Sequence, residues 1–198
     1  VLCPLYGALT LAEQRQAILP APQGKRKVVL ATNIAETSLT IEGIRLVVDC
    51  AQERLARYDA RTGLTRLITQ RISQASMTQR AGRAGRLEPG ICLHLLAKEQ
   101  AERAAAQGEP EILQSDLSGL LMELLQWGCT DPEQLNWLDT PPAINLQAAK
   151  RLLQMLGALE GDRLSARGQK MAALGNDPRL AAMLVSTKND DEAASAAK

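Results

Sequence analysis

Three arginines and two glycines alternate between Gln79 and Arg86, and these residue types suit phosphate chemistry. Arginine carries a permanent charge and a planar fork of donors that fits phosphate oxygens, and Gln79 is able to orient a water. At a spacing of three, Arg83 and Arg86 face the same way at a helix end. The alternative is a solvated basic helix face. Gly82 and Gly85 argue against it, because each glycine weakens a helix by about 1 kcal/mol relative to alanine.

A second polar block begins with Thr32 and Asn33, which follow the apolar run 28–30. This run predicts a strand, and small donors at a strand end are well placed to bind a nucleic-acid phosphate. The alternative is an ordinary strand-to-helix turn that is closed by an Asx hydrogen bond. The block continues with three further polar side chains, Ser38, Thr40 and Glu42.

Taken together and in this order, residues 31–41 and 79–86 resemble motifs V and VI of the DEAH-box helicases of superfamily two. Ser73 matches the family's usual lead into motif VI, and residues 3–9 resemble its motif IV region. The resemblance covers nearly the whole chain, and blocks of this length are more specific than a lone Gly-x-Arg. It implies the C-terminal part of an ATP-dependent RNA helicase core.

The resemblance also implies an α/β fold in three parts. Residues 1–108 would form a second RecA-like domain, with a parallel sheet and helices but without its first strand and helix. Residues 109–175 would form a mainly helical winged-helix domain, and residues 176–198 the truncated start of a further, ratchet-like helical domain. The sequence has no phosphate loop and no Asp-Glu-Ala-His box, so we expect the isolated chain to be inactive.

The family binds ATP between two RecA-like lobes, and this implies roles for the arginine block. By resemblance, Arg83 and Arg86 are the arginine fingers that reach the phosphates, and Gln79 lies near the γ-phosphate and the attacking water. Phosphoryl transfer needs positioned positive charge and an oriented nucleophile, which these residue types supply. For Arg80, the alternative is an ion pair with an acid inside the domain.

The resemblance extends to the nucleotide. It implies that three residues sense the nucleotide state or approach the ribose and the catalytic water, with local capping as the alternative: Ser38, Thr40 and Glu42. Family members often stack the adenine on an aromatic residue before the Pro-Ala-Pro turn, where this chain has Ile18. An aliphatic contact predicts loose nucleotide choice. The implied cofactor is ATP with Mg²⁺, bound mainly by the upstream lobe, and no metal site is expected within this chain.

Nucleic-acid contacts follow from the same resemblance. Thr32 and Asn33 would bind phosphates of single-stranded RNA, while Gly7 either offers its backbone amide to that strand or is a plain turn glycine. The chain has two Trp, two Tyr and no Phe, so backbone contacts are favoured over base stacking. Such contacts do not separate RNA from DNA. A DNA translocase of the same superfamily, or a non-catalytic nucleic-acid or partner-binding module, therefore remains open. The upstream RecA-like domain is the other expected partner.

The net charge of +1 hides an uneven distribution of charge. Residues 52–90 hold eight arginines against three acids, whereas residues 99–140 hold nine acids against one arginine. This asymmetry predicts one phosphate-facing lobe and one that is not. The four cysteines are widely spaced, which is typical of small core residues in a reducing compartment. With no apolar run approaching roughly 18 residues, the sequence predicts a cytoplasmic protein without membrane contact.

Apolar periodicity and capping residues predict the local elements. Strands are expected at 1–5, 27–31, 44–50 and 90–97, with a hairpin over 52–69. In the first half, helices are expected at 11–19 behind Thr10 and from Ser73 through Ala84. After residue 108, helices are expected at 116–127, 145–156, 165–174 and from Asp177 on, with a small hairpin at 159–164. His94 is expected to be a core or half-buried residue of its strand.

Overall fold

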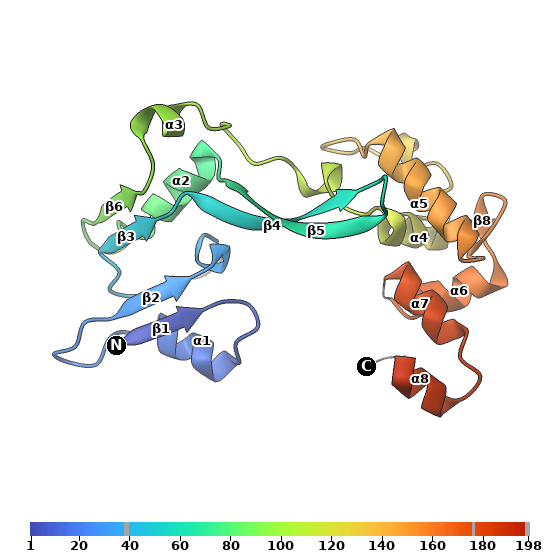
Figure 1. The fold of residues 1–198 in the computed structure, drawn as a ribbon, viewed down its shortest axis with the longest axis horizontal. Coiled ribbons are helices and arrows are strands. Elements are labelled where there is room, and N and C mark those ends of the chain that lie inside the picture. The colour runs from blue at the N-terminus through green and yellow to red at the C-terminus, as the bar shows by residue number, and fades with distance from the viewer. Residues whose placement is uncertain (38–39, 176, 197–198) are drawn as a thin grey trace. The chain divides into compact units, whose positions relative to one another are not determined.

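The computed structural model describes residues 1–37, 40–175 and 177–196 (Figure 1). The chain forms two compact units: unit 1 comprises residues 1–55 and 68–108, and unit 2 comprises residues 56–67 and 109–198. The division of the second half into a winged-helix domain and a further helical domain stays a prediction. Ser38 lies outside the described residues.

Unit 1 is built on two pairs of parallel strands. β1 (Leu2–Leu5) pairs with β2 (Val28–Ala31), and β3 (Leu46–Asp49) pairs with β6 (Ile91–His94). Parallel partners need a crossover connection, and a helix lies between the two strands of each pair in the chain. This arrangement confirms the predicted α/β class with parallel strands and helices.

Helix α1 (Leu11–Ile18) begins at the predicted cap. The Thr10 side chain accepts a hydrogen bond from the backbone of Glu13, whose carboxylate accepts one from the Thr10 backbone N–H at 2.8 Å. This capping box satisfies two donors that a helix start leaves without partners. The helix buries Ala17 in a small core with two residues of β1, Cys3 and Leu5.

Helix α2 (Gln74–Ala81) starts behind the predicted cap Ser73 but ends three residues before the predicted Ala84. The backbone N–H groups of Arg83 and Ala84 bond to carbonyls three residues back, at 3.1 Å each. The last turn is therefore tightened, as is common where a helix runs out of partners. As a result, the two arginines proposed as fingers lie beyond the helix. A short helix, α3 (Lys98–Glu102), follows β6.

The predicted hairpin is present as β4 (Gln52–Asp59) and β5 (Leu64–Arg71). Its turn is closed by the Asp59 carboxylate, which accepts the Arg61 backbone N–H at 3.0 Å, and by Gly63 in the left-handed region with φ 68°. Residues 56–67 of the hairpin belong to unit 2, where the Tyr58 N–H donates to the Gln114 carbonyl at 2.8 Å.

Unit 2 is mainly helical. Its helices are α4 (Ser118–Trp127), α5 (Ala143–Met155), α6 (Ala166–Ala173), α7 (Pro178–Val185) and α8 (Asp190–Ala196). A small antiparallel hairpin between α5 and α6 consists of β7 (Leu159–Glu160) and β8 (Arg163–Leu164). Short 3₁₀ turns occur in the two units at η1 (Asn33–Ala35), η2 (Glu111–Leu113) and η3 (Pro132–Gln134). The order of helices and hairpin follows the prediction, and α8 was not predicted.

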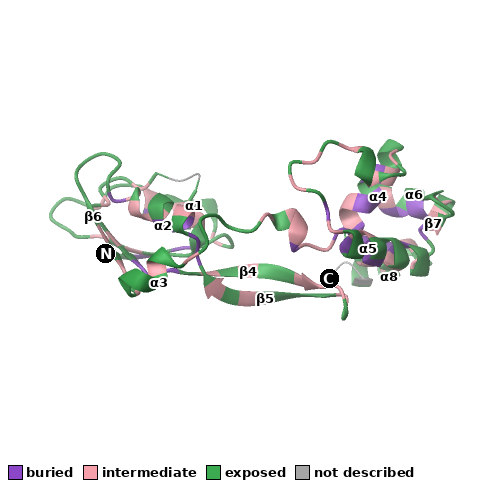
Figure 2. Cartoon of the chain, turned by 90° about the horizontal axis from the view of Figure 1, so that it is seen from above, coloured by how far each residue is buried: buried purple, intermediate pink, exposed green. Residues whose placement is uncertain are grey.

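The largest buried core lies in unit 2, where Figure 2 shows buried segments on α4, α5 and α6. Leu153 of α5 and Met171 of α6 are fully buried in it. Gly168 allows α6 to approach the chain before β7, since a Cβ at Gly168 would overlap the Ala158 carbonyl. Nothing in the sequence pattern singled out this glycine.

Candidate functional site

A pocket of about 450 Å³ in unit 1 lies beside the end of α2. It brings together all three residues that were predicted to be catalytic, Gln79, Arg83 and Arg86. The remaining lining residues are Glu36, Thr37 and Gly82. Because the two polar blocks of the sequence line one pocket, their juxtaposition is a property of the fold.

Local structure explains how the arginines reach this pocket. Gln79 is exposed on the last turn of α2, and the chain leaves the helix at Gly82. A Cβ added at Gly85 would meet no atom within 4 Å, and one at Gly82 would meet only two carbonyl oxygens of α2 at 3.4 Å. Gly85 therefore leaves open space between Arg83 and Arg86, where a ligand is able to approach.

Arg80 does not line the pocket and forms an internal ion-pair cluster instead. Its Nε donates to a Glu36 carboxylate oxygen at 2.9 Å, and its Nη1 donates to Asp49 at 2.9 Å and to the Gln52 carbonyl at 3.0 Å. Burial disfavours the charged guanidinium, but its hydrogen bonds to both acids outweigh this effect and raise the pKa of Arg80. The alternative predicted for Arg80, an ion pair inside the domain, is confirmed.

Asp49 is the buried anchor of this cluster. It ends β3, is 5% exposed, and accepts hydrogen bonds from the Ala51 backbone N–H at 3.0 Å and from Arg80. His94, half-buried as predicted, places its Nδ1 3.1 Å from the other carboxylate oxygen. Sequence reasoning missed Asp49, although a lone acid at the end of an apolar strand was a usable signal.

The two arginines that line the pocket make contacts with the segment after β2. Arg83 Nη2 donates to the Glu36 carbonyl, and Arg86 Nη1 donates to the Thr40 hydroxyl at 2.7 Å. Burial and the neighbouring charge of Arg86 lower the pKa of Arg83. Since Arg80 already pairs with the Glu36 carboxylate, two close guanidinium groups dominate the charge of the pocket. An anion such as a phosphate would relieve their repulsion.

The other predicted residues that the structure describes are not part of the lining of this pocket. Thr40 approaches it through Arg86, whereas Glu42 is exposed and Ile18 is half-buried at the end of α1. Thr32 and Asn33 are exposed at the end of β2, and Thr32 makes no side-chain capping bond to η1. Exposed Gly7 follows β1, where a Cβ would meet nothing within 4 Å. Three of these residues, Gly7, Thr32 and Asn33, thus follow the carboxyl ends of two paired strands.

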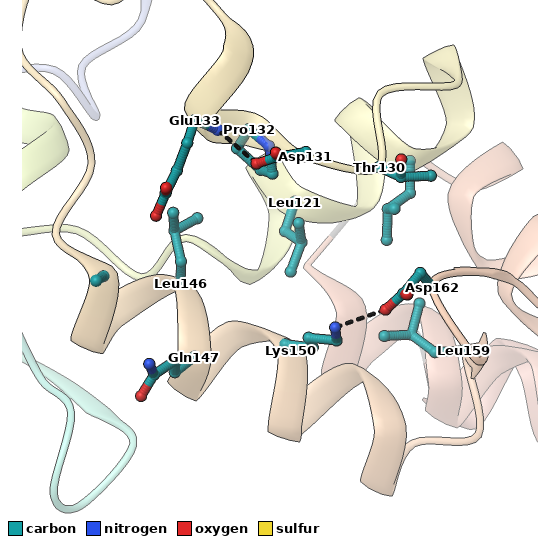
Figure 3. A pocket seen from close by; sticks show the side chains of 12 residues that line it. Leu121, Thr130, Asp131, Pro132, Glu133, Leu146, Gln147, Lys150, Leu159 and Asp162 are labelled. Carbon is teal, nitrogen blue, oxygen red and sulfur yellow. Dashed lines mark hydrogen bonds and ion pairs between the residues drawn. The ribbon is translucent and has the colours of Figure 1, made fainter.

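A second cavity, of about 190 Å³, lies in unit 2 and has a different character (Figure 3). Three of its polar side chains, Asp131, Lys150 and Asp162, form hydrogen bonds or an ion pair within unit 2. Lys150 Nζ donates to Asp162 at 2.6 Å, and Asp131 accepts the Glu133 backbone N–H at 3.1 Å. The cavity holds none of the residues that the sequence singled out for phosphate chemistry.

Cysteines and membrane contact were two further expectations. Cys3 is buried, Cys92 and Cys129 are half-buried, and Cys50 is exposed, so Cys50 is not the core residue that was predicted. All four thiols are free. In the part of the chain that the structure describes, every helix is too short or too polar to cross a bilayer.

Comparison with known proteins defines the class. Residues 2–88 match the helicase conserved C-terminal domain family. This match covers three of the parallel strands, β1, β2 and β3, together with helix α2 and all the residues that line the pocket beside it. The chain carries a RecA-like helicase C-terminal domain and is similar over its length to DEAH-box helicases.

Particular relatives sharpen this assignment. The chain is 87% identical over its full 198 residues to the ATP-dependent RNA helicase HrpB of Escherichia coli, of which it covers 24%. It is 37% identical over 185 residues, 91% of the chain, to human ATP-dependent RNA helicase DHX33, of which it covers 26%. A crystal structure of Escherichia coli DEAH/RHA helicase HrpB matches the whole chain at 87% identity with a TM-score of 0.94, over 25% of that protein's chain. The chain thus spans about a quarter of the length of these relatives.

Proposed function

We propose that this chain is part of an ATP-dependent RNA helicase, in which Arg83 and Arg86 act as arginine fingers in ATP hydrolysis. The observation that carries the proposal is that Gln79, Arg83 and Arg86 line the same pocket. Two named helicases that the chain resembles over nearly its full length support the assignment. A cytoplasmic location is part of the same proposal.

The residues of the pocket suit a role in phosphoryl transfer. Arg83 and Arg86 offer two planar forks of donors to phosphate oxygens, on which negative charge is spread in the transition state. Gln79 has an exposed amide that is able to hold the attacking water. A phosphate would replace the Thr40 hydroxyl as the partner of Arg86, whereas Arg83 would retain its bond to the Glu36 carbonyl. Their fixed charge lowers the barrier without any proton transfer by the arginines.

The donor set of the pocket fits the triphosphate of ATP, since guanidinium groups bind phosphate oxygens and the lining contains one acid, already paired with Arg80. When bound, ATP supplies the transferable phosphoryl group and Mg²⁺ screens its charge. Within the described ranges, no group of three or more His, Cys, Asp or Glu side chains is placed to hold a metal ion. Following the family resemblance, the proposal assigns Mg²⁺ mainly to the upstream RecA-like lobe. Ser38, Thr40, Glu42 and Ile18 are proposed to lie toward the nucleotide.

Single-stranded RNA is the proposed nucleic-acid partner. Thr32, Asn33 and Gly7 are exposed beyond the ends of two paired strands, where open α/β sheets bind ligands. Their small donors suit phosphate contacts, which give affinity without reading the base sequence. The upstream RecA-like domain of the parent protein is the proposed partner on the nucleotide side.

Alanine at either finger tests the proposal in the full-length parent. We expect Arg83→Ala and Arg86→Ala each to lower RNA-stimulated ATP turnover by about tenfold or more, which is ~1.4 kcal/mol or more in the barrier. The dissociation constant for ATP should change much less, because a finger acts mainly on the transition state. Lysine at either position should restore little, since it lacks the bidentate fork.

Phosphate release with single-stranded homopolymer RNA measures the turnover. Arg61→Ala, an exposed arginine in the hairpin turn of unit 2, is the matched control for loss of one positive charge. Turnover near the parent level in Arg86→Ala would refute its role as a finger.

A further inference from the structure

We infer that Glu36 is a positioning residue, which holds Arg83 in place for phosphoryl transfer through a shared contact with Arg80. This inference rests on the proposed function of Arg83. Two different groups of Glu36 contact two arginines: its carboxylate binds Arg80, and its backbone carbonyl accepts Arg83. One residue of the segment after β2 is therefore tied at two points to the segment that ends α2.

Arg80 provides the fixed side of this arrangement. Its side chain is 13% exposed and bonds to Glu36, to buried Asp49 and to the Gln52 carbonyl, so it is held from three directions. Asp49 is itself held by the Ala51 backbone. Because Arg80 is bonded to two other groups, Asp49 and the Gln52 carbonyl, it restrains the Glu36 carboxylate that it binds.

Glu36 transmits this restraint to the pocket. Its carboxylate is 16% exposed, so water weakens the pair with Arg80 less than it weakens an exposed pair. The Glu36 carbonyl that accepts Arg83 lies in the same residue, at the end of η1. If the carboxylate loses its charge, Arg80 keeps Asp49 as a partner, but the segment 33–37 loses its ion pair with α2. Arg83 then loses a defined acceptor, although no pocket-lining arginine has been removed.

Glu36→Gln in the full-length parent tests this inference, because glutamine keeps the size and an acceptor oxygen but removes the charge. We expect kcat for RNA-stimulated ATP hydrolysis to fall about tenfold, with KM for ATP within about twofold, because a misplaced group costs rate more than ground-state binding. Glu36→Asp keeps the charge with a shorter reach, and should recover part of the lost kcat. Glu88→Gln is the matched control, since Glu88 pairs with Arg45 in unit 1 but is 53% exposed and does not line the pocket.

A double-mutant cycle separates positioning from a general structural role. In an Arg83→Ala background, Glu36→Gln should cause no further loss of kcat, because the group that it positions is gone. Equal losses in both backgrounds, or normal kcat in Glu36→Gln while Arg83→Ala is impaired, would overturn this inference alone. Normal turnover in Arg83→Ala would overturn both the finger role and its positioning. If Glu36→Gln does not fold, the same cycle with Glu36→Asp decides between these outcomes.

Discussion

The candidate site in unit 1 and the helical core of unit 2 are held together by different interactions. Around the site, Arg80 bonds to two acids that are 16% and 3% exposed, and the adjoining apolar core is small. In unit 2, one continuous apolar cluster extends over α4 to α7 and includes fully buried Leu153 and Met171. Its main ion pair, between Arg179 and Asp116, is more exposed at 37% and 18%.

This contrast indicates where geometry matters most. Ion pairs and hydrogen bonds have directions, so the Arg80 cluster fixes the orientation of the segments that carry the pocket. An apolar core stabilises without fixing a particular donor or acceptor. We therefore expect changes in the Arg80 cluster to alter chemistry and stability together, and changes in the core of unit 2 to alter mainly stability.

The largest expected difference between the two units is in the free energy of unfolding that is lost when the ion-paired arginine of each, Arg80 or Arg179, is replaced. Arg80→Met leaves Glu36 and Asp49 without their cation, and breaking a buried pair in this way costs about 3–5 kcal/mol. Arg179→Met should cost less, because the Arg179 side chain is 37% exposed and solvent screens its pairs with Asp116 and Asp177. Denaturant unfolding of the full-length parent and both variants measures this. Equal losses would show that the Arg80 cluster does not stabilise the protein more than a surface pair.

Leu153→Ala tests the complementary expectation, that a change in the core of unit 2 lowers stability without affecting the pocket beside α2. Truncating a fully buried leucine costs about 2–5 kcal/mol, here confined to the core of unit 2. Hydrogen exchange in the full-length parent should show faster exchange in α4, α5 and α6, with α2 unchanged. ATP affinity should stay within about twofold, since no residue of the pocket beside α2 is altered. Faster exchange of α2 to the same degree would contradict the separation of the two units.

Residue types and spacing, together with the family resemblance that they carry, predicted which residues gather at the site. The spacing predicted that Arg83 and Arg86 face the same way, the family resemblance added Gln79, and one pocket contains all three. The capping residues Thr10 and Ser73 fixed two helix starts, because a cap is a local interaction. The α/β class followed from strands that alternate with helices.

Contacts between distant segments could not be predicted in the same way. Arg80 lies 44 residues from Glu36 and 31 from Asp49, and no periodicity links them. The early end of α2 depends on hydrogen bonds after Ala81, which propensity alone does not specify. Gly168 reads as an ordinary helix glycine, and only the nearby Ala158 carbonyl shows why a side chain is excluded. These features arise from tertiary packing, which a single sequence leaves undetermined.

The central claim is that the charges of Arg83 and Arg86 act on the transition state of phosphoryl transfer. The most direct test compares the affinity of the full-length parent and of Arg86→Ala for ADP alone and for ADP with aluminium fluoride, in the presence of Mg²⁺ and single-stranded RNA. The planar fluoride complex resembles the transferring phosphoryl group, so a finger should bind it more tightly than the ground state. We predict a loss of about tenfold or more in affinity for the fluoride complex in Arg86→Ala, with ADP affinity within about twofold. Equal affinities of the two proteins for the fluoride complex would contradict the account.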